Sequence, residues 1–349
     1  MPALQMTIYP VILAGGKGER FWPLSTPETP KPFLRFFSEQ SLLQQTYDRA
    51  RKLAPADHIF VVAGDKHASL CREQLPELPV SHLLLEPCGR DTAAAIGFAS
   101  LSLPEDALML VMPADHLIPD ASAFAETVQS AALFIMEHGG PGTFGIHPLR
   151  PDTNYGYIQA DSTNLGRGPF GVYAVRKFTE KPSLEAASEF IRNGSYYWNS
   201  GIFLWRVSRI RQLLALHLPE LWEGLQRLQN PQSREEVAKN YAQLPRISID
   251  FGVMQKADNI VVFPSSFQWD DIGTWSSLLR ILPLDADSNL VWGNHTGLDT
   301  SNCIIYGESH TIATAGIQDL VIVQRGNQTL ICHISYADRL KELLAKLPS

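Results

Sequence analysis

Cysteine is scarce in this sequence of 349 residues, and its four cysteines are scattered: Cys71, Cys88, Cys303 and Cys332. They form no Cys-x-x-Cys pair, so neither a zinc-ligand motif nor a disulfide framework is supported. No apolar run approaches 18 residues, which excludes a membrane-spanning helix of ordinary length. The N-terminus also lacks a basic segment followed by a long apolar run, so we expect no signal peptide and a cytoplasmic location.

Net positive charge is lacking as well. The chain has 29 Lys and Arg against 36 Asp and Glu, a formal charge of −7. This balance argues against a broad surface for nucleic acid or for an anionic membrane. A polyphosphate ligand would need local countercharges, supplied by a few basic side chains and a metal ion. The hydrophobic content of 45% and charged content of 19% are those of an ordinary globular protein.

Strand and helix patterns alternate from residue 7 to about residue 146. Apolar runs predict strands at residues 7–13, 59–63, 81–86, 107–112 and 142–146. Between them, helical patterns occupy residues 41–54, 66–75, 92–103 and 122–138. This order predicts βαβ crossovers and a doubly wound, mostly parallel, Rossmann-like α/β sheet. In such sheets the ligand binds beyond the carboxyl ends of the strands.

After residue 150 the predicted secondary structure no longer alternates regularly between strand and helix. Residues 150–205 mix turns and strands, residues 206–257 are helical in pattern, and residues 259–263 return to strand. From about residue 285, short apolar pieces separated by Gly and Asn predict stacked short strands, followed by a helix over residues 337–347. We therefore expect a large domain at residues 1–283 and a small β-helix-like segment at residues 284–349.

A glycine-rich loop follows the first expected strand: Leu13-Ala14-Gly15-Gly16-Lys17-Gly18. Its spacing fits neither a P-loop nor a dinucleotide fingerprint. Glycines allow backbone N–H groups to approach an anion closely, and such a nest binds phosphate. With Lys17 and Arg20 close by in sequence, the loop predicts a cradle for nucleotide phosphates. The alternative is a simple glycine turn after an edge strand.

Carboxylates in two distant segments suggest a metal site. Asp115 comes directly after the strand at residues 107–112, and Asp270 and Asp271 lie in a turn much later in the chain. Mg²⁺ binds one or two carboxylates and takes phosphate and water oxygens for the rest. We predict that Asp115 and Asp271 hold Mg²⁺. One of the two adjacent aspartates is expected to cap the helix that carries Trp275, and the sequence leaves open which of them binds the metal.

The segment Glu86-Pro-Cys-Gly-Arg-Asp-Thr92 follows the third expected strand. Asp91 or Thr92 is expected to cap the next helix, whose N-terminus favours negatively charged groups. Glu86, Arg90 and Thr92 are predicted to recognise the base and ribose of a nucleotide. The alternative is that the segment only caps the helix.

Three further segments carry candidate ligands for a sugar phosphate. In Phe178-Thr-Glu-Lys-Pro182, Glu180 suits a sugar hydroxyl and Lys181 a phosphate, although an exposed pair of this kind is often only solvated. Asn199 lies in an aromatic strand, where a buried amide needs partners such as a sugar hydroxyl. Lys31 is flanked by prolines, so it should be well ordered and able to contact phosphate.

These motifs resemble the sugar-1-phosphate nucleotidyltransferases. Leu13-Ala-Gly-Gly-Lys-Gly-Glu-Arg20 is similar to the signature loop of the family, and Lys31-Pro32 to the lysine segment that follows it. Further segments are similar to those of mannose-1-phosphate guanylyltransferases: Glu86-Pro with Arg90-Asp-Thr-Ala93, Pro113-Ala-Asp-His116, Tyr155-Gly-Tyr-Ile158, Phe178-Thr-Glu-Lys-Pro182, Trp198-Asn-Ser-Gly-Ile202, Ser248-Ile-Asp250 and Trp269-Asp-Asp-Ile-Gly-Thr274.

The resemblance implies an enzyme that joins GTP and α-D-mannose 1-phosphate to give GDP-mannose and pyrophosphate, with Mg²⁺ as cofactor. It assigns catalytic roles to Arg20, Lys31, Asp115, Asp271 and Lys181, with the metal on Asp115 and Asp271. Nucleotide binding falls to Leu13, Ala14, Gly15, Gly16, Lys17, Gly18, Glu86, Arg90 and Thr92. Sugar binding falls to Gly156, Glu180 and Asn199. A homodimer is possible on this resemblance, and no nucleic-acid or membrane partner is expected.

Two alternatives to this function stay open. One is an enzyme of the same fold that uses another sugar 1-phosphate, such as a heptose or glucose, or another nucleoside triphosphate. The other is a regulatory subunit that binds a nucleotide sugar without catalysis. The latter would be expected to have lost a metal carboxylate or the loop arginine, whereas Asp115, Asp271 and Arg20 are all present.

Overall fold

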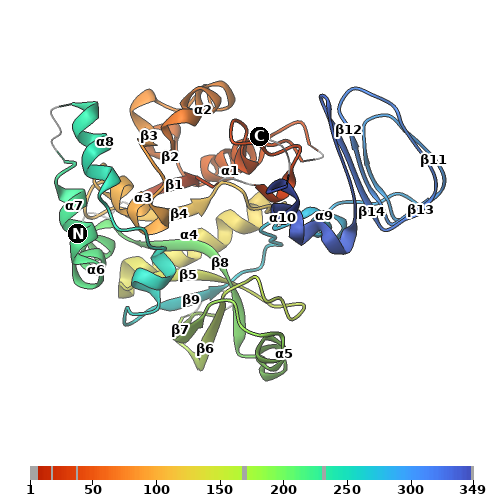
Figure 1. The fold of residues 1–349 in the computed structure, drawn as a ribbon. Coiled ribbons are helices and arrows are strands. Elements are labelled where there is room, and N and C mark those ends of the chain that lie inside the picture. The colour runs from red at the N-terminus through yellow and green to blue at the C-terminus, as the bar shows by residue number, and fades with distance from the viewer. Residues whose placement is uncertain (1–6, 17–18, 37, 167–170, 230–232, 347–349) are drawn as a thin grey trace. The chain divides into compact units, whose positions relative to one another are not determined.

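The computed structural model of the chain describes residues 7–16, 19–36, 38–166, 171–229 and 233–346 (Figure 1). The chain divides into two compact units. The first contains residues 1–15, 46–114 and 118–269, and the second contains residues 16–45, 115–117 and 270–349. The boundary predicted at residues 283 and 284 stays a prediction.

A nine-stranded sheet forms the first unit, in the order β3-β2-β1-β4-β8-β5-β9-β7-β6. Its strands are β1 (Ile8–Ala14), β2 (Phe60–Gly64), β3 (Leu83–Glu86), β4 (Leu108–Pro113), β5 (Gly142–Ile146), β6 (Tyr157–Asn164), β7 (Tyr173–Thr179), β8 (Tyr196–Arg206) and β9 (Val261–Pro264). The strands predicted before residue 150 are thus present within two residues of their expected ends.

The sheet is parallel in one half and mixed in the other. Strands β1 to β4 pair in parallel, as the alternating βα order predicts. Strand β8 runs antiparallel to both β4 and β5, and β6 and β7 pair antiparallel to each other. The α/β fold class is confirmed. The antiparallel strands β6, β7 and β8 come from the segment at residues 150–205, which the sequence predicts as a mixture of turns and strands.

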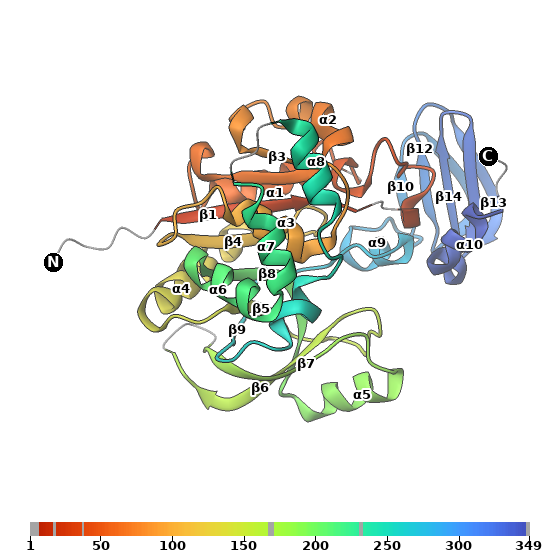
Figure 2. The ribbon, with the colours of Figure 1, turned by 60° about the vertical axis from the view of Figure 1, so that its left-hand side comes forward.

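The helices of the chain outside its C-terminal part are α1 (Leu42–Arg51), α2 (Ala68–Gln74), α3 (Asp91–Ser100), α4 (Ala121–His138), α5 (Leu184–Asn193), α6 (Val207–His217), α7 (Pro219–Gln226) and α8 (Arg234–Ala242). Apolar residues of β1 and β4, among them Val11, Met109 and Val111, share one buried cluster with α3, α6 and α7. Figure 2 shows α6, α7 and α8 following one another over this part of the sheet. Burial by helices explains why these strands are continuously apolar.

Local signals fix the ends of several helices. Asp120 caps α4 by accepting hydrogen bonds from the backbone N–H groups of Ser122 and Ala123, and Ser183 caps α5 in the same way. Helix α5 ends at Gly194, whose φ of 75° lies in the left-handed region that favours glycine. A π-helical turn, η6 (Asp250–Met254), lies in the region that the sequence predicted only as helical.

The second unit contains short strands and short helices. Its elements after residue 270 are α9 (Trp275–Ile281), β10 (Leu290–Trp292), β11 (His295–Ser301), β12 (Ile304–Gly307), β13 (Ile312–Gln318), β14 (Leu320–Arg325), β15 (Gln328–His333), the 3₁₀ helix η7 (Ile334–Arg339) and α10 (Leu340–Leu344). Strands β10, β12 and β14 stack in parallel, β15 pairs antiparallel with β14, and β11 pairs with β13. Figure 1 shows them in blue as the predicted β-helix-like segment.

The hydrophobic core of the second unit contains side chains from residues 16–45 and from residues 270–349. Phe21, Leu34 and Phe36 are buried with Trp275 of α9 and with Ile304 of β12. The last predicted helix, over residues 337–347, is wrong in its extent. The described part of that segment is 3₁₀ up to Arg339 and α-helical only from Leu340 to Leu344.

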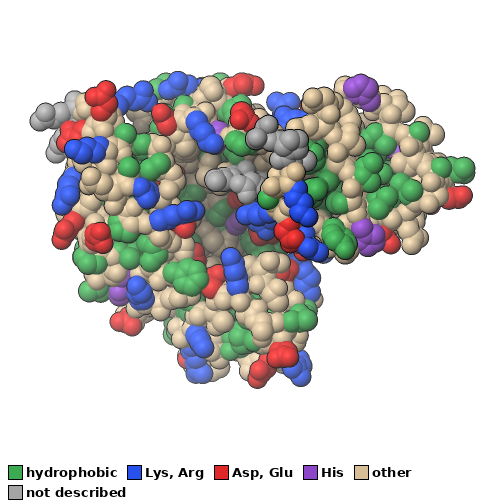
Figure 3. Space-filling view, in the orientation of Figure 1, with side chains coloured by type: hydrophobic (Ala, Val, Ile, Leu, Met, Phe, Trp, Pro, Cys, Tyr) green, Lys and Arg blue, Asp and Glu red, His purple; other side chains and the backbone are tan. Residues whose placement is uncertain are grey.

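Two surface properties bear on function. On the face shown in Figure 3, basic and acidic side chains are interspersed, in keeping with the modest net charge. Among the described residues, no helix is long and apolar enough to cross a membrane.

Candidate active site

A short antiparallel bridge in the second unit brings two distant segments together. The backbone N–H of Leu117 donates to the carbonyl of Asp270 at 2.9 Å, and the N–H of Asp270 donates back to Leu117 at 3.1 Å. The pairing places residues 115–117 beside residues 270–271. The two aspartates that the sequence assigned to the metal, Asp115 and Asp271, therefore belong to adjacent stretches of backbone.

Lys31 links these two segments. It begins the 3₁₀ helix η2 (Lys31–Phe33), between Pro30 and Pro32, and its residue is only 6% exposed. Its ammonium donates to Asp115 Oδ2 at 2.9 Å and to the backbone carbonyl of Asp271 at 2.5 Å. A buried ammonium needs such partners, since burying an unpaired charge is costly. These two contacts fix a positive charge between the two segments.

The Asp115 carboxylate is held in its ionised form. Burial alone would raise its pKa, but the Lys31 ammonium and the His116 side chain more than offset this effect and lower the pKa below its usual value. The carboxylate oxygens lie 2.9 Å from Lys31 Nζ and 3.8 Å from His116 Nε2. Asp115 is therefore an anionic oxygen donor at neutral pH.

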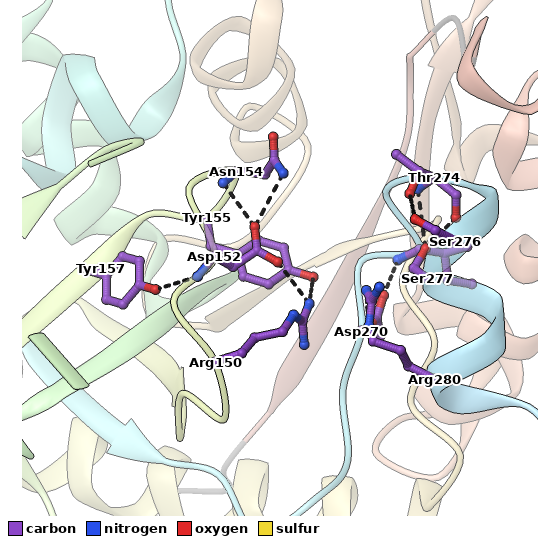
Figure 4. A network of polar contacts seen from close by, with 11 residues as sticks. Arg150, Asp152, Asn154, Tyr155, Tyr157, Asp270, Thr274, Ser276, Ser277 and Arg280 are labelled. Atoms are coloured by element: carbon purple, nitrogen blue, oxygen red, sulfur yellow. Dashed lines mark hydrogen bonds and ion pairs between the residues drawn. The ribbon is translucent and has the colours of Figure 1, made fainter. Parts of the chain in front are cut away.

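The adjacent aspartates Asp270 and Asp271 differ in their surroundings. Asp270 is 5% exposed; its carboxylate accepts from the backbone N–H of Ile272 at 2.8 Å and lies 3.5 Å from an Arg280 nitrogen (Figure 4). The Asp271 carboxylate lies beside Gly273, where an added Cβ would be 3.3 Å from its Oδ1 and 3.7 Å from Arg20 Nη1. Asp270 thus stabilises the turn, whereas the Asp271 carboxylate and the Arg20 guanidinium both lie near Gly273.

The expectation that one of these aspartates caps the following helix is wrong. Thr274 is the N-cap of α9, in a capping box completed by Ser277 (Figure 4). The Asp270 side chain is instead used by Ile272 and Arg280.

The donors present suit a hard divalent cation. Asp115 and Asp271 offer carboxylate oxygens, which Mg²⁺ prefers. In the described ranges of the chain, no group of three or more His, Cys, Asp or Glu side chains is placed to hold a metal ion. Two carboxylates fit an ion that takes its remaining ligands from phosphate and water.

The glycine loop is described only in part. Leu13 and Ala14 end β1, and Gly15 and Gly16 are exposed. Gly16 has a φ of 105°, a conformation that side chains other than glycine rarely adopt. The predicted residues Lys17 and Gly18 lie outside the described part of the chain. Arg20 follows on the 3₁₀ helix η1 (Glu19–Phe21) and is exposed.

In the first unit, Glu86 and Arg90 both bind the end of helix α8. The Tyr241 hydroxyl donates to Glu86 Oε1 at 2.5 Å, and both side chains are buried. Burial raises the pKa of Glu86, and the Tyr241 hydrogen bond partly offsets that rise. The Arg90 guanidinium donates to the backbone carbonyl of Ala242. These contacts fix α8 beside the segment that the sequence assigned to the nucleotide.

The predicted cap of helix α3 is also wrong. The helix begins at Asp91, and Arg90 occupies the N-cap position without a side-chain hydrogen bond. Asp91 accepts from the adjacent Thr92 N–H at 2.8 Å, while the Thr92 hydroxyl accepts from the N–H of Ile249 at 2.8 Å. The Thr92 hydroxyl thus holds a distant segment, and Thr92 itself lies inside the helix.

The three residues assigned to the sugar lie together in the first unit. A Cβ added to Gly156 would be 2.2 Å from Glu180 Oε1, so the absence of a side chain makes room for that carboxylate. The Asn199 N–H donates to the Gly156 carbonyl at 2.8 Å, and the Asn199 side chain partly offsets the rise in the pKa of Glu180 that burial causes. Lys181 follows Glu180 with a φ of 46° and is exposed.

Sequence reasoning assigned no role to Asp250, which joins this set. Its carboxylate accepts from Asn199 Nδ2 at 2.7 Å. Asp250 could have been found from the sequence, because it is the acidic residue of the Ser248-Ile-Asp250 segment, which is part of the family resemblance.

Arg150 was also missed. Its guanidinium donates to Asp152 at 2.8 Å and lies 5.0 Å from the ring centre of Trp198, while the Tyr157 hydroxyl accepts from the N–H of Asp152 (Figure 4). These contacts order the loop that precedes Gly156.

The chain matches two known family models. The family model described as nucleotidyl transferase matches residues 9–288, and the model described as MannoseP isomerase/GMP-like beta-helix domain matches residues 293–347. The chain belongs to the nucleotidyl transferase family.

Individual relatives resemble the chain over nearly its whole length. It is 40% identical over 354 residues to the xanthan biosynthesis protein XanB of Xanthomonas campestris pv. campestris (strain B100), covering 98% of the chain and 73% of that protein. It is 38% identical over 361 residues to a mannose-1-phosphate guanylyltransferase of Escherichia coli, covering 97% and 75%. A Thermus thermophilus structure described as a mannose-1-phosphate geranyltransferase matches with a TM-score of 0.89 and 37% identity, covering 99% of this chain and 100% of that one.

Proposed function

We propose that the chain transfers GMP from GTP to α-D-mannose 1-phosphate, giving GDP-mannose and pyrophosphate. The observation that carries the proposal is the binding of Lys31 to both Asp115 and the Asp271 backbone, because it sets the Asp115 carboxylate and a cation beside the Asp271 segment, where phosphate chemistry needs them. The substrates are supported by the Escherichia coli relative named mannose-1-phosphate guanylyltransferase, to which the chain is similar over 97% of its length.

The reaction is a direct displacement at phosphorus. A phosphate oxygen of mannose 1-phosphate forms a bond to the α-phosphorus of GTP, and the bond from that phosphorus to the bridging oxygen of the β-phosphate breaks. Pyrophosphate leaves with the electron pair. The incoming phosphate is the nucleophile, so no covalent intermediate with the protein is needed. The barrier is lowered by positioning and by neutralising charge.

The chain's own cations and carboxylates supply that neutralisation. Lys31 and Arg20 offset negative charge on the triphosphate, and Asp115 and Asp271 provide the oxygens that hold a divalent cation. Nucleotidyl transferases use such a cation, and we propose Mg²⁺. When bound, it would draw charge from the reacting phosphate oxygens.

The remaining predicted residues bind and orient the substrates. We assign Lys181 to the phosphate group of the sugar phosphate. We assign Gly156, Glu180 and Asn199 to its sugar hydroxyls. Glu86, Arg90 and Thr92, together with the loop Leu13-Ala14-Gly15-Gly16-Lys17-Gly18, are assigned to the nucleotide. A cytoplasmic location and a homodimer remain our predictions for the protein in the cell.

A substrate panel tests the proposal. The purified chain would be given MgCl₂ with each of GTP, ATP, UTP, CTP and dTTP, in combination with the 1-phosphates of mannose, glucose and a heptose, and pyrophosphate release would be measured. We expect the highest kcat/KM for GTP with mannose 1-phosphate. A higher value for another pair would reassign the substrate, and binding of GDP-mannose without any turnover would support a regulatory subunit.

A further inference from the structure

Ile272 has an unusual backbone conformation. Its φ is 43°, which lies in the left-handed region that residues with a Cβ atom rarely adopt. The other non-glycine residues with positive φ in the described ranges are aspartate, asparagine, serine or lysine, so Ile272 is the one β-branched residue among them. A branched Cβ makes this conformation unfavourable, and contacts elsewhere must therefore hold it in place.

The side chain of Ile272 is anchored in the core of the second unit. Ile272 is 1% exposed and belongs to the same buried cluster as Phe21 and Trp275. The burial of an apolar side chain of this size stabilises a fold by about as much as one strained residue costs. The core of the second unit can therefore keep Ile272 left-handed.

Hydrogen bonds fix the peptide groups on both sides of Asp271. The carbonyl of Asp270 accepts from the Leu117 N–H at 2.9 Å, which holds the peptide group before Asp271. In the peptide group after it, the Asp271 carbonyl accepts from the Lys31 ammonium at 2.5 Å. The N–H of that same group, from Ile272, donates to Asp270 Oδ1 at 2.8 Å. Because both peptide groups are held, the direction of the Cα–Cβ bond of Asp271 is set.

The left-handed conformation of Ile272 makes these contacts compatible with one another. Rotation about its N–Cα bond towards an ordinary negative φ would move the side chain and the following residues relative to the N–H. Either the side chain would leave the core or the N–H would leave Asp270. The next residue, Gly273, lies beside the Asp271 carboxylate, so the backbone after Ile272 also bounds the space of that carboxylate.

We propose that Ile272 is a positioning residue, which aims the Asp271 carboxylate at the divalent cation through a left-handed backbone that its buried side chain enforces. The inference rests on the proposed function, in which Asp271 helps to hold the cation. It gives a part in the reaction to a core residue whose side chain offers no polar group.

The test compares Ile272→Ala with Ile272→Gly. Both substitutions remove the anchoring side chain, but glycine adopts a φ of this kind without the steric cost that alanine meets. Turnover of GTP with mannose 1-phosphate would be measured at saturating MgCl₂. We expect Ile272→Ala to lower kcat about tenfold, and Ile272→Gly to recover about fivefold of that loss.

Two further measurements, both made in EDTA without substrates, do not depend on turnover. We expect Ile272→Gly to melt about 2 °C above Ile272→Ala, because alanine is strained at this φ. Hydrogen exchange at residues 270–274 should also be slower in Ile272→Gly than in Ile272→Ala. A side chain that only fills the core predicts the reverse order in all three measurements, since glycine leaves the larger cavity.

Ser288 provides the matched control. It is an exposed residue of the same unit with a φ of 64°. Ser288→Gly should melt above Ser288→Ala for the same backbone reason, while kcat of both variants stays within about twofold of the wild type. A backbone preference alone would then be visible in stability at both positions, and in turnover at Ile272 only.

Ile272→Val keeps the inference testable if both truncated variants fail to fold. It retains part of the anchor, and hydrogen exchange at residues 270–274 should then rise more than exchange in strands β10 to β15. An equal rise in both regions would overturn the inference. So would a kcat of Ile272→Gly equal to or below that of Ile272→Ala in a protein whose wild type makes GDP-mannose, and the proposed function would stand. If the wild type makes no GDP-mannose, the proposed function fails and this inference fails with it.

Discussion

Lys31 Nζ lies 2.9 Å from Asp115 Oδ2 and 2.5 Å from the carbonyl oxygen of Asp271, so that one buried ammonium binds both segments that carry the candidate metal ligands. This places a fixed positive charge next to the Asp115 carboxylate and the backbone of Asp271. The arrangement makes the second unit's stability and its proposed chemistry depend on the same side chain.

Replacing Lys31 by Met should destabilise the protein in a pH-dependent manner. Lys31 lowers the pKa of Asp115, so the pair stabilises the fold above the ordinary aspartate pKa of about 3.9, and this contribution is lost as the pH falls through the lower folded-state pKa. We expect a loss of about 2 kcal/mol at pH 7 that shrinks towards pH 3. Urea unfolding in the presence of EDTA measures it, with the exposed Lys66→Met as control. An equal loss at both pH values would contradict the ion-pair explanation.

Asp270→Asn and Asp271→Asn should have opposite effects. The Asp270 carboxylate is buried, accepts a hydrogen bond from the Ile272 N–H and pairs with Arg280. Its replacement should therefore lower the free energy of unfolding by about 1–3 kcal/mol and leave kcat of the folded protein almost unchanged. Asp271→Asn should leave the free energy of unfolding nearly unchanged and lower kcat about 100-fold. Thermal melts and pyrophosphate release measure the two effects. The reverse pattern would assign the metal to Asp270.

The Glu86–Tyr241 pair gives a second stability test, independent of the metal. Tyr241→Phe leaves the buried Glu86 without its donor and should cost about 1–3 kcal/mol. Because burial raises the pKa of Glu86, wild-type stability should fall as the pH rises from about 4.3 through the folded-state pKa. Glu86→Gln removes that charge, so the variant should gain stability relative to the wild type above this range. Parallel pH–stability curves would show that Glu86 is not the group responsible.

Gly156→Ala should affect substrate binding more than folding. The added Cβ would meet the end of the flexible Glu180 side chain at 2.2 Å, and the carboxylate can move aside at small cost. We expect a change in unfolding free energy below about 1 kcal/mol and a KM for mannose 1-phosphate raised about tenfold. In a Glu180→Ala background the same substitution should have almost no further effect. A full additional tenfold loss there would show that Gly156 acts independently of Glu180.

The sequence predicted the parallel half of the sheet well because each of its strands is an apolar run and a helical pattern separates it from the next strand. It could not predict the antiparallel position of β8 between β4 and β5, since strand pairing depends on tertiary contacts rather than on periodicity. The last helix was overextended because its apolar spacing suits both 3₁₀ and α-helical turns.

The candidate site, too, could be predicted from the sequence only in part. Prolines on either side of Lys31 and a carboxylate after β4 are local signals, and they indicated residues that the structure brings together. The use of Thr92 by Ile249 and of Asn199 by Asp250 joins residues far apart in sequence. Such contacts leave no local pattern, which is why the cap expected at Asp91 or Thr92 was wrong. The cap expected at Asp270 or Asp271 failed for a local reason, because Thr274 and Ser277 form the capping box of α9.

The most direct test of the central claim is a ³¹P NMR time course of the purified chain with GTP, mannose 1-phosphate and MgCl₂, run alongside Asp115→Asn and the exposed control Asp338→Asn. The account predicts equal amounts of GDP-mannose and pyrophosphate with the wild type and the control, and a rate about 100-fold lower with Asp115→Asn. Release of GDP and inorganic phosphate, or an Asp115→Asn rate equal to that of the wild type, would contradict it.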